Sequence, residues 1–107
     1  MSITVNLYYK GHDGNAKKFA EEMEKNGIAD AVRAEDGNLR YEYFIPMSDS
    51  ETILLIDCWK DQAALDVHHA SPMMKQIAEL REKYDLHMTV ERYVSDDNET
   101  DEHFIRK

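Results

Sequence analysis

Three stretches of the chain alternate between apolar and polar residues with a period of two: residues 3–10, 39–45 and 87–94. Such alternation is typical of strands that bury one face. A fourth stretch, residues 52–59, carries apolar side chains on both faces and is rich in β-branched residues. It predicts a central strand buried on both sides. The hydrophobic pattern therefore predicts four strands.

Apolar residues in two of the intervening regions recur at helical spacing. The first helix follows Asn15, a possible N-cap, and its apolar line is Ala16, Phe19, Ala20 and Met23; residues 28–34 add a short amphipathic segment. The second helical region follows Asp61, also a good N-cap, and Ser71-Pro72 predicts a second cap and a kink or fresh start. Beyond it runs the apolar stripe Met73, Ile77, Leu80 and Tyr84.

The resulting order, β-α-β-β-α-β, predicts an α+β, ferredoxin-like fold with an antiparallel sheet and its helices on one face. Leu54, Ile56 and Cys58 lie on the opposite face of the central strand from Leu55 and its neighbours. Because two helices can cover only one face of such a sheet, we expect a second copy to cover the other. The sequence predicts a homodimer formed sheet against sheet.

Composition limits the possible partners. The 107 residues suit one domain, predicted over residues 1–94, followed by an acidic and mobile tail over residues 95–107. A net charge of −9 argues against nucleic acid and against anionic membrane surfaces. There is no membrane-spanning run and no export signal, and a single cysteine excludes an internal disulfide. We expect a cytoplasmic protein.

Rare residues gather between positions 57 and 72, where the only tryptophan, the only cysteine and two of the five histidines occur. This segment and the second strand resemble the antibiotic biosynthesis monooxygenase (ABM) domain family over about residues 1–94. The residues that carry the resemblance are Asn38-Leu39-Arg40-Tyr41-Glu42-Tyr43, Leu54-Leu55-Ile56-Asp57-Cys58-Trp59-Lys60-Asp61, Ala64-Leu65-Asp66-Val67-His68 and Ser71-Pro72.

The resemblance implies a dimeric α/β barrel with a pocket between sheet and helices in each protomer. It also implies oxidation of small phenols or quinols without a cofactor, although relatives include isomerase-like enzymes and haem-degrading enzymes. Two positions depart from the family pattern: Asp57 stands where many members have Glu, and Met73 where quinol-oxidising relatives commonly have His. Ala78 occupies the position of the haem ligand, which argues against haem degradation.

The candidate catalytic residues are His68 and Asp57. The family motif favours His68 over the adjacent His69 as the inward-facing ring, because neighbouring positions on a helix point about 100° apart. A neutral imidazole could take a proton from a phenol near neutral pH, with Asp57 orienting it. The alternative is a structural histidine that holds the helix to the strand, bonded to Asp57 or to a backbone carbonyl.

The candidate substrate-binding residues are Trp59, Tyr41, Tyr43, Asn6, His69 and Met73. Trp59 could form a flat wall for an aromatic substrate or could simply fill the core. Tyr41 and Asn6 are predicted to donate hydrogen bonds to a substrate oxygen if their faces meet in one pocket. If these faces meet the partner subunit instead, the same residues belong to the dimer interface.

The sequence motifs give no support for a metal site or a nucleotide-binding site. The sequence contains no metal-ligand spacing and no glycine-rich phosphate loop. We expect no tightly held cofactor and no metal. The leading hypothesis is a cofactor-independent monooxygenase; the alternatives are an isomerase or tautomerase, or a non-catalytic ligand-binding dimer.

Overall fold

The computed structural model describes residues 1–98 and 100–107. The elements follow in the order β1 (Ile3–Lys10), α1 (Asn15–Lys25), α2 (Ile28–Arg33), β2 (Asn38–Phe44), β3 (Thr52–Trp59), α3 (Gln62–His69), α4 (Met73–Lys83), β4 (His87–Val94) and the 3₁₀ helix η1 (Thr100–Phe104). All four predicted strands are present, and three of them have the predicted bounds. The predicted α+β fold is confirmed.

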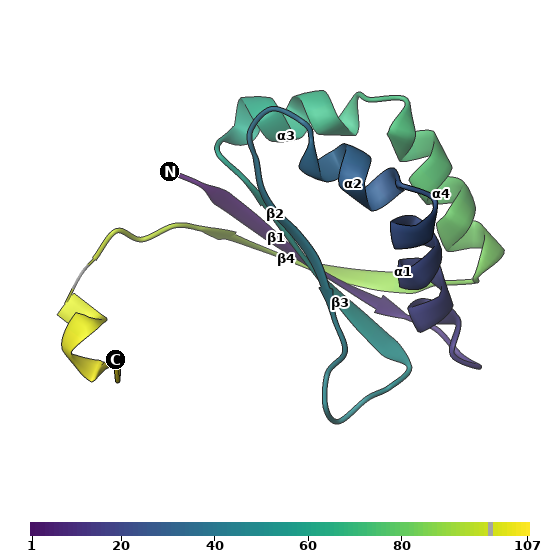
Figure 1. The fold of residues 1–107 in the computed structure, drawn as a ribbon, viewed down its shortest axis with the longest axis horizontal. Helices are drawn as coiled ribbons and strands as arrows, with labels where there is room; N and C mark the ends of the chain where they lie inside the picture. The colour runs from purple at the N-terminus through teal and green to yellow at the C-terminus, as the bar shows by residue number, and fades with distance from the viewer. Residues whose placement is uncertain (99) are drawn as a thin grey trace.

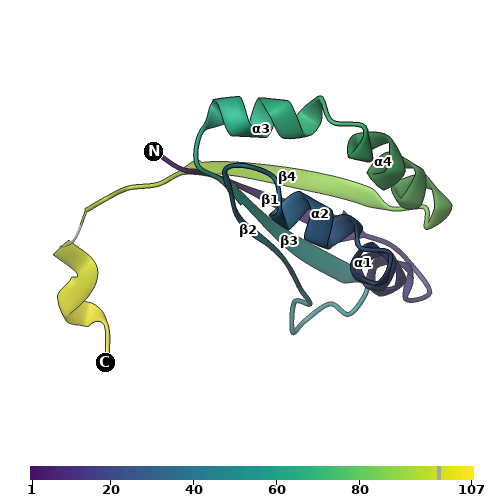
Figure 2. The same cartoon turned by 45° about the horizontal axis from the view of Figure 1, so that its top comes forward.

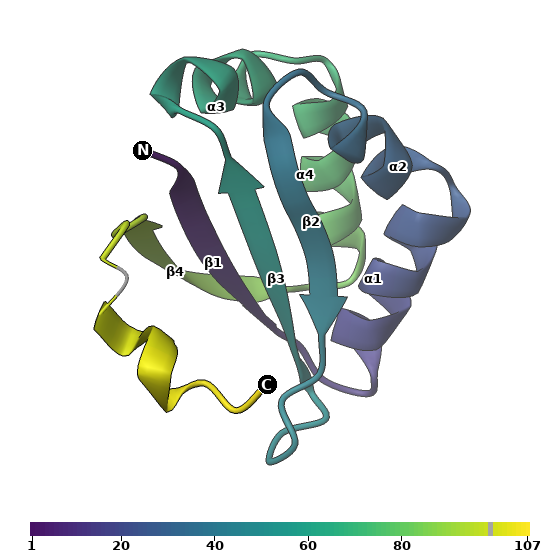
Figure 3. The ribbon, with the colours of Figure 1, turned by 60° about the vertical axis from the view of Figure 1, so that its left-hand side comes forward.

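The strands form one antiparallel sheet in the order β2-β3-β1-β4, which is not closed into a barrel within the chain. The four α-helices cover one face of this sheet, and the opposite face carries none of them (Figure 1). Figure 2 shows α3 and α4 end to end above the sheet, and Figure 3 shows the strand order with β2 and β4 at the edges. The predicted ferredoxin-like arrangement is confirmed.

The core lies between the sheet and the helices. The predicted apolar line of α1 is fully buried, as are Ile77 and Leu80 of α4. The helix-facing side of β3 is buried along its whole length, at Ile53, Leu55, Asp57 and Trp59. Among these four buried side chains, Asp57 is the one carboxylate, and its neighbours are apolar.

Two of the three predicted caps differ in the structure. Asp61 caps α3 as expected, since its Oδ1 accepts from Ala64 N–H at 2.9 Å. Asn15 lies inside α1, after Gly14 at φ 75°, and its amide donates instead to the carbonyl of Tyr84 at 3.2 Å. Ser71 donates back to the carbonyl of His68 at 2.7 Å and so closes the end of α3 rather than capping α4.

Among residues 1–98 and 100–107, no helix is long and apolar enough to cross a membrane. The chain beyond β4 leads away from the sheet (Figure 1), and Phe104 and Ile105 within it are exposed.

Candidate active site

A row of four directly opposed residues crosses the sheet on its helix-facing side. Tyr41 of β2 pairs with Asp57 of β3, Asp57 pairs with Val5 of β1, and Val5 pairs with Arg92 of β4. Directly opposed residues of antiparallel strands project on the same side of a sheet. The Arg92 guanidinium donates to Oε1 of Gln62 at the start of α3, so this row lies on the side of the sheet that carries the helices.

Asp57 is the ionisable group at the centre of this row. It is only 6% exposed, and its Oδ1 accepts a hydrogen bond from Trp59 Nε1 at 2.7 Å. Burial raises the pKa of Asp57 to about 6, against the opposing effects of the charge on His68 and of the Trp59 hydrogen bond. A carboxylate with a pKa near neutrality can take and return a proton at physiological pH.

His68 is buried and is held by two neighbours. Its Nδ1 donates to Oε2 of Glu35 at 2.6 Å, and its ring stacks on Trp59 with centroids 4.8 Å apart and an interplanar angle of 27°. Asp57, which the sequence suggested as the orienting group, is hydrogen-bonded to Trp59 instead. Glu35 comes from the loop between α2 and β2, 33 positions away, and no local sequence signal points to it.

His69 faces a different direction from its neighbour and is exposed. The pKa of His69 is lowered, first by desolvation and then by the positive charges of His68, Arg81 and Arg92, while Asp66 opposes them. The two histidines therefore lie in different surroundings. His68 is held in the corner between α3 and β3, and His69 lies at the exposed surface.

Tyr41 and Tyr43 both lie on the helix-facing side of β2, next to each other. The Tyr43 hydroxyl donates to the Tyr41 hydroxyl at 3.4 Å, and the rings meet edge to face. Burial raises the pKa of both phenols, so both keep their protons at neutral pH. Neither can act as a base, and Tyr41, which accepts from Tyr43, keeps its own proton to donate.

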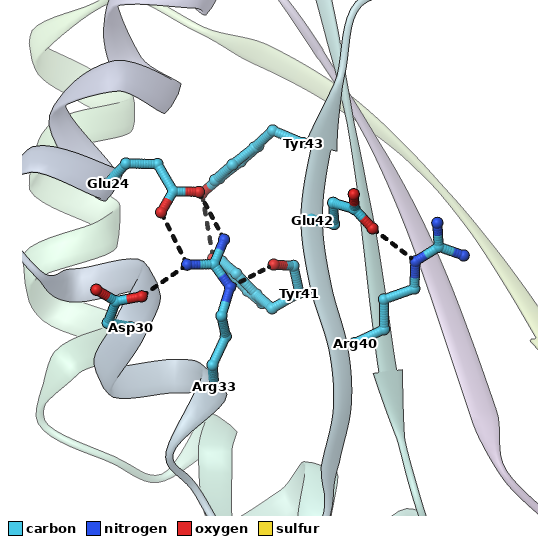
Figure 4. Close-up of polar contacts among 7 residues, drawn as sticks. All are labelled: Glu24, Asp30, Arg33, Arg40, Tyr41, Glu42 and Tyr43. Atoms are coloured by element: carbon cyan, nitrogen blue, oxygen red, sulfur yellow. Dashed lines mark hydrogen bonds and ion pairs between the residues drawn. The ribbon is translucent and has the colours of Figure 1, made fainter.

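Arg33 fixes the strand that carries these tyrosines (Figure 4). Its Nε donates to the backbone carbonyl of Tyr41 at 2.8 Å. Its two terminal nitrogens bind both carboxylate oxygens of Glu24, at 2.8 and 2.6 Å, and Nη1 also binds Asp30 at 2.9 Å. Because Glu24 lies on α1 and Asp30 on α2, one guanidinium joins both helices to the edge of β2.

Asn6 does not join this group. It pairs with Ile56 of β3 and Glu91 of β4, and therefore projects from the opposite face to Asp57 and Tyr41. The predicted meeting of Asn6 with Tyr41 in one pocket is wrong for this reason. Its Oδ1 is enclosed and has no hydrogen-bond partner among the residues that the structure describes.

Three further residues belong to the helix-facing side and were not singled out by the sequence: Tyr9, Arg81 and Arg92. Arg81 of α4 donates to the hydroxyl of the buried Tyr9 at 3.1 Å, and its guanidinium lies 5.5 Å from the centroid of that ring. Arg81 is one turn after the buried Ile77, a spacing that points both toward the sheet. Met73 is partly buried and packs against the core.

The described part of the chain contains no group of three or more histidine, cysteine, aspartate or glutamate side chains arranged to hold a metal ion. The polar groups on the helix-facing side are instead the Asp57 carboxylate, whose pKa is raised, several neutral phenols and two arginines. Such a set can move a proton and stabilise an anion next to apolar walls.

Comparison with known proteins gives consistent results. The family model described as "Antibiotic biosynthesis monooxygenase" matches residues 2–80. A protein of Bacillus subtilis (strain 168) named "Putative monooxygenase YcnE" is 28% identical over 67 residues, which are 63% of this chain and 68% of that protein.

Solved structures share the fold at lower identity. A "putative antibiotic biosynthesis monooxygenase" from Deinococcus radiodurans superposes with a TM-score of 0.77 at 21% identity, covering 92% of this chain and 95% of the other. SnoaB, a cofactor-independent oxygenase from Streptomyces nogalater, gives 0.76 at 13% identity, over 92% and 97% of the two chains, in its N63A form. The matched family model spans most of the chain, from β1 into α4. The chain belongs to the antibiotic biosynthesis monooxygenase family.

Proposed function

We propose that this protein is a cofactor-independent monooxygenase that oxidises a small phenolic or quinol-like molecule. The observation that carries the proposal is the position of Asp57, a buried carboxylate of raised pKa on the helix-facing side of the sheet. Kinship with the family supports the reaction class, and the named activity of SnoaB supports the lack of a cofactor.

In this proposal the proton acceptor is Asp57 rather than His68. Because Nδ1 of His68 is bound to Glu35 and its ring is stacked on Trp59, His68 is better suited to hold α3 against β3. Asp57 has a single hydrogen bond, from Trp59, among the described residues, which leaves its second oxygen for a substrate hydroxyl. Tyr41, opposite Asp57, then serves as a neutral donor near the substrate oxygen, and Tyr43 donates to Tyr41.

The reaction balances without a cofactor. Asp57 takes the phenolic proton, and the resulting electron-rich anion reduces O2. One oxygen atom is bonded to the ring carbon, the other leaves as water, and the substrate loses two hydrogens. A phenol with a free ring position thus gives a quinone. The protein supplies deprotonation and a surrounding that excludes water.

Oxygen uptake with a panel of small quinols and phenols tests the proposal. Asp57→Asn keeps an acceptor for the Trp59 hydrogen bond but loses the base, and we expect kcat to fall by about 100-fold or more. Asp36→Asn, on the surface, is the matched control and should be unaffected. His68→Ala tests whether His68, rather than Asp57, is the proton acceptor. Equal rates in wild type and Asp57→Asn, or no uptake in either, would contradict the proposal.

The same carboxylate could also serve an isomerase, since proton transfer alone requires no O2. Activity on the same panel that persists under anaerobic conditions, followed by proton exchange or product isomerisation, would favour that function over oxygenation.

We also propose that two copies pair through the sheet faces that carry no helix. Leu54, Ile56 and Cys58 are partly buried there, and the enclosed Asn6 Oδ1 without a partner lies on the same face. Sedimentation at micromolar concentration should give a dimer, and Ile56→Asp should give a folded monomer. A wild-type monomer would contradict this arrangement.

A further inference from the structure

On the helix-facing side of the sheet, two arginines of this acidic protein lie without a carboxylate partner among the described residues. The chain has 22 acidic and 13 basic residues, and Arg33 and Arg40 both form ion pairs with glutamate. Arg81 and Arg92, in contrast, form no ion pair with any described residue, and each donates to a neutral oxygen instead, on Tyr9 and Gln62. Nε of Arg81 is enclosed and has no hydrogen-bond partner within residues 1–98 and 100–107.

Both arginines lie on the side of the sheet that carries Asp57. Arg92 belongs to the Asp57 row, with only Val5 between them. Two strand spacings separate the backbones of Arg92 and Asp57, about 10 Å. One aromatic ring with para substituents spans most of this distance, and the flexible arginine side chain can cover the rest. Arg81 approaches the same side from α4 through its contact with Tyr9.

The surface beside the Asp57 row, toward Tyr9 and Arg81, is apolar and partly open. Leu7 is 8% exposed, and Val90, directly opposite it on β4, is 52% exposed on the helix-facing side. Met88, opposite the buried Tyr9, is 44% exposed. The helices therefore do not cover β4, and a flat apolar molecule could lie against this wall.

We propose that Arg92 and Arg81 form an anion subsite for the carboxylate of an aromatic substrate whose hydroxyl lies at Asp57. A guanidinium and a carboxylate make short, charge-assisted hydrogen bonds, and an enclosed N–H without a partner favours a ligand that supplies one. The position of the hydroxyl rests on the proposed function. The subsite defines the substrate class as a phenol that carries a carboxylate at the opposite end of its ring.

Binding of two probes to the full-length protein tests this proposal without requiring turnover. Para-hydroxybenzoate and para-hydroxybenzamide have nearly the same shape and differ in charge. Isothermal titration calorimetry should show that the acid binds about 10-fold more tightly than the amide, as expected for one charge-assisted interaction. Added salt should weaken binding of the acid more than that of the amide.

Arg92→Gln removes the charge and keeps a hydrogen-bonding side chain. It should abolish the preference for the acid and leave affinity for the amide unchanged, while Arg92→Lys should keep part of the preference. Arg106→Gln, in the exposed tail, makes the same change in net charge and should preserve the wild-type preference.

Three results would overturn the subsite: equal binding of acid and amide, equal loss of both in Arg92→Gln, or no binding of either probe. These outcomes are separate from failure of the oxygenase proposal. If the acid binds through Arg92 but no quinol supports oxygen uptake, the anion subsite stands and the monooxygenase function falls.

Discussion

The two edge strands of the sheet meet the helices in opposite ways. At β2, one arginine joins the strand to α1 and α2 through two carboxylates, and Tyr41 beneath the helices is buried (Figure 4). At β4, every residue from His87 to Val94 is exposed, and Arg92 reaches α3 through a neutral amide. Ion pairs therefore close the β2 edge, whereas the β4 edge is open and its Arg92 has no carboxylate partner among the described residues.

If Asp57 acts as we propose, this difference lets one small core hold both a stable fold and a reactive group. Asp57 lies in a row between the two edges, two strands from Arg92 and next to Tyr41. Burial raises the pKa of its carboxyl, and in the proposed function a ligand reaches it from the open side. Mutations at the two edges should therefore affect different properties: stability at β2 and ligand binding at β4.

The largest expected effect concerns Asp57 itself. Its pKa is raised from 3.8 to about 6 in the folded protein, a change of roughly 2 units or about 3 kcal/mol. Between about pH 4 and pH 6 the folded state keeps a proton that the unfolded state has released, so wild type loses stability as pH rises through this window. Asp57→Asn cannot titrate and should be more stable than wild type at pH 7 by up to about 3 kcal/mol.

Urea unfolding of both proteins from pH 3.5 to 7.5 measures this difference, and taking the difference cancels the titration of other groups. Asp36→Asn, on the surface, is the matched control and should follow wild type throughout. A stability difference that is constant with pH would show that Asp57 keeps an ordinary carboxyl pKa and that the closed edge does not bury it.

The strands could be predicted from the sequence because residues 3–10, 39–45 and 87–94 alternate with a period of two, and residues 52–59 carry apolar side chains on both faces. The break between α3 and α4 followed from Pro72 for an equally local reason. Helix caps were predicted less well, since glycine at φ 75° can precede a helix without a side-chain cap, as Gly14 does.

The site was less predictable because its contacts depend on register and on distant loops. Alternation shows that Tyr41 and Asn6 each belong to one face, but only the pairing of β1, β2 and β3 decides whether the two faces coincide, and here they do not. Glu35 binds His68 across 33 positions, so neither helix nor strand periodicity could reveal it. Arg81 and Arg92 differ from Arg33 and Arg40 in having no ion pair with a described residue, and ion pairs between distant residues cannot be predicted from local sequence patterns.

A smaller effect separates the two edges directly. Arg33→Met removes the guanidinium but keeps much of the aliphatic packing, and it leaves the Tyr41 carbonyl and two carboxylates without their donor. We expect a loss of about 2 kcal/mol in the free energy of unfolding, since hydrogen bonds to charged groups contribute roughly 1.5–3 kcal/mol each but this site is partly exposed to solvent. Arg92→Met should cost about 0.5 kcal/mol or less, because its partner is the neutral side chain of Gln62 at the protein surface.

Chemical denaturation at pH 7 compares the two variants in one measurement, and para-hydroxybenzoate titration provides the complementary one. Arg33→Met should bind the probe with wild-type affinity once it is folded, and Arg92→Met should lose affinity while keeping its stability. Equal destabilisation by both substitutions would mean that Arg92 closes the β4 edge as Arg33 closes β2. The open wall formed by Met88 and Val90 would then belong to the fold rather than to a ligand site.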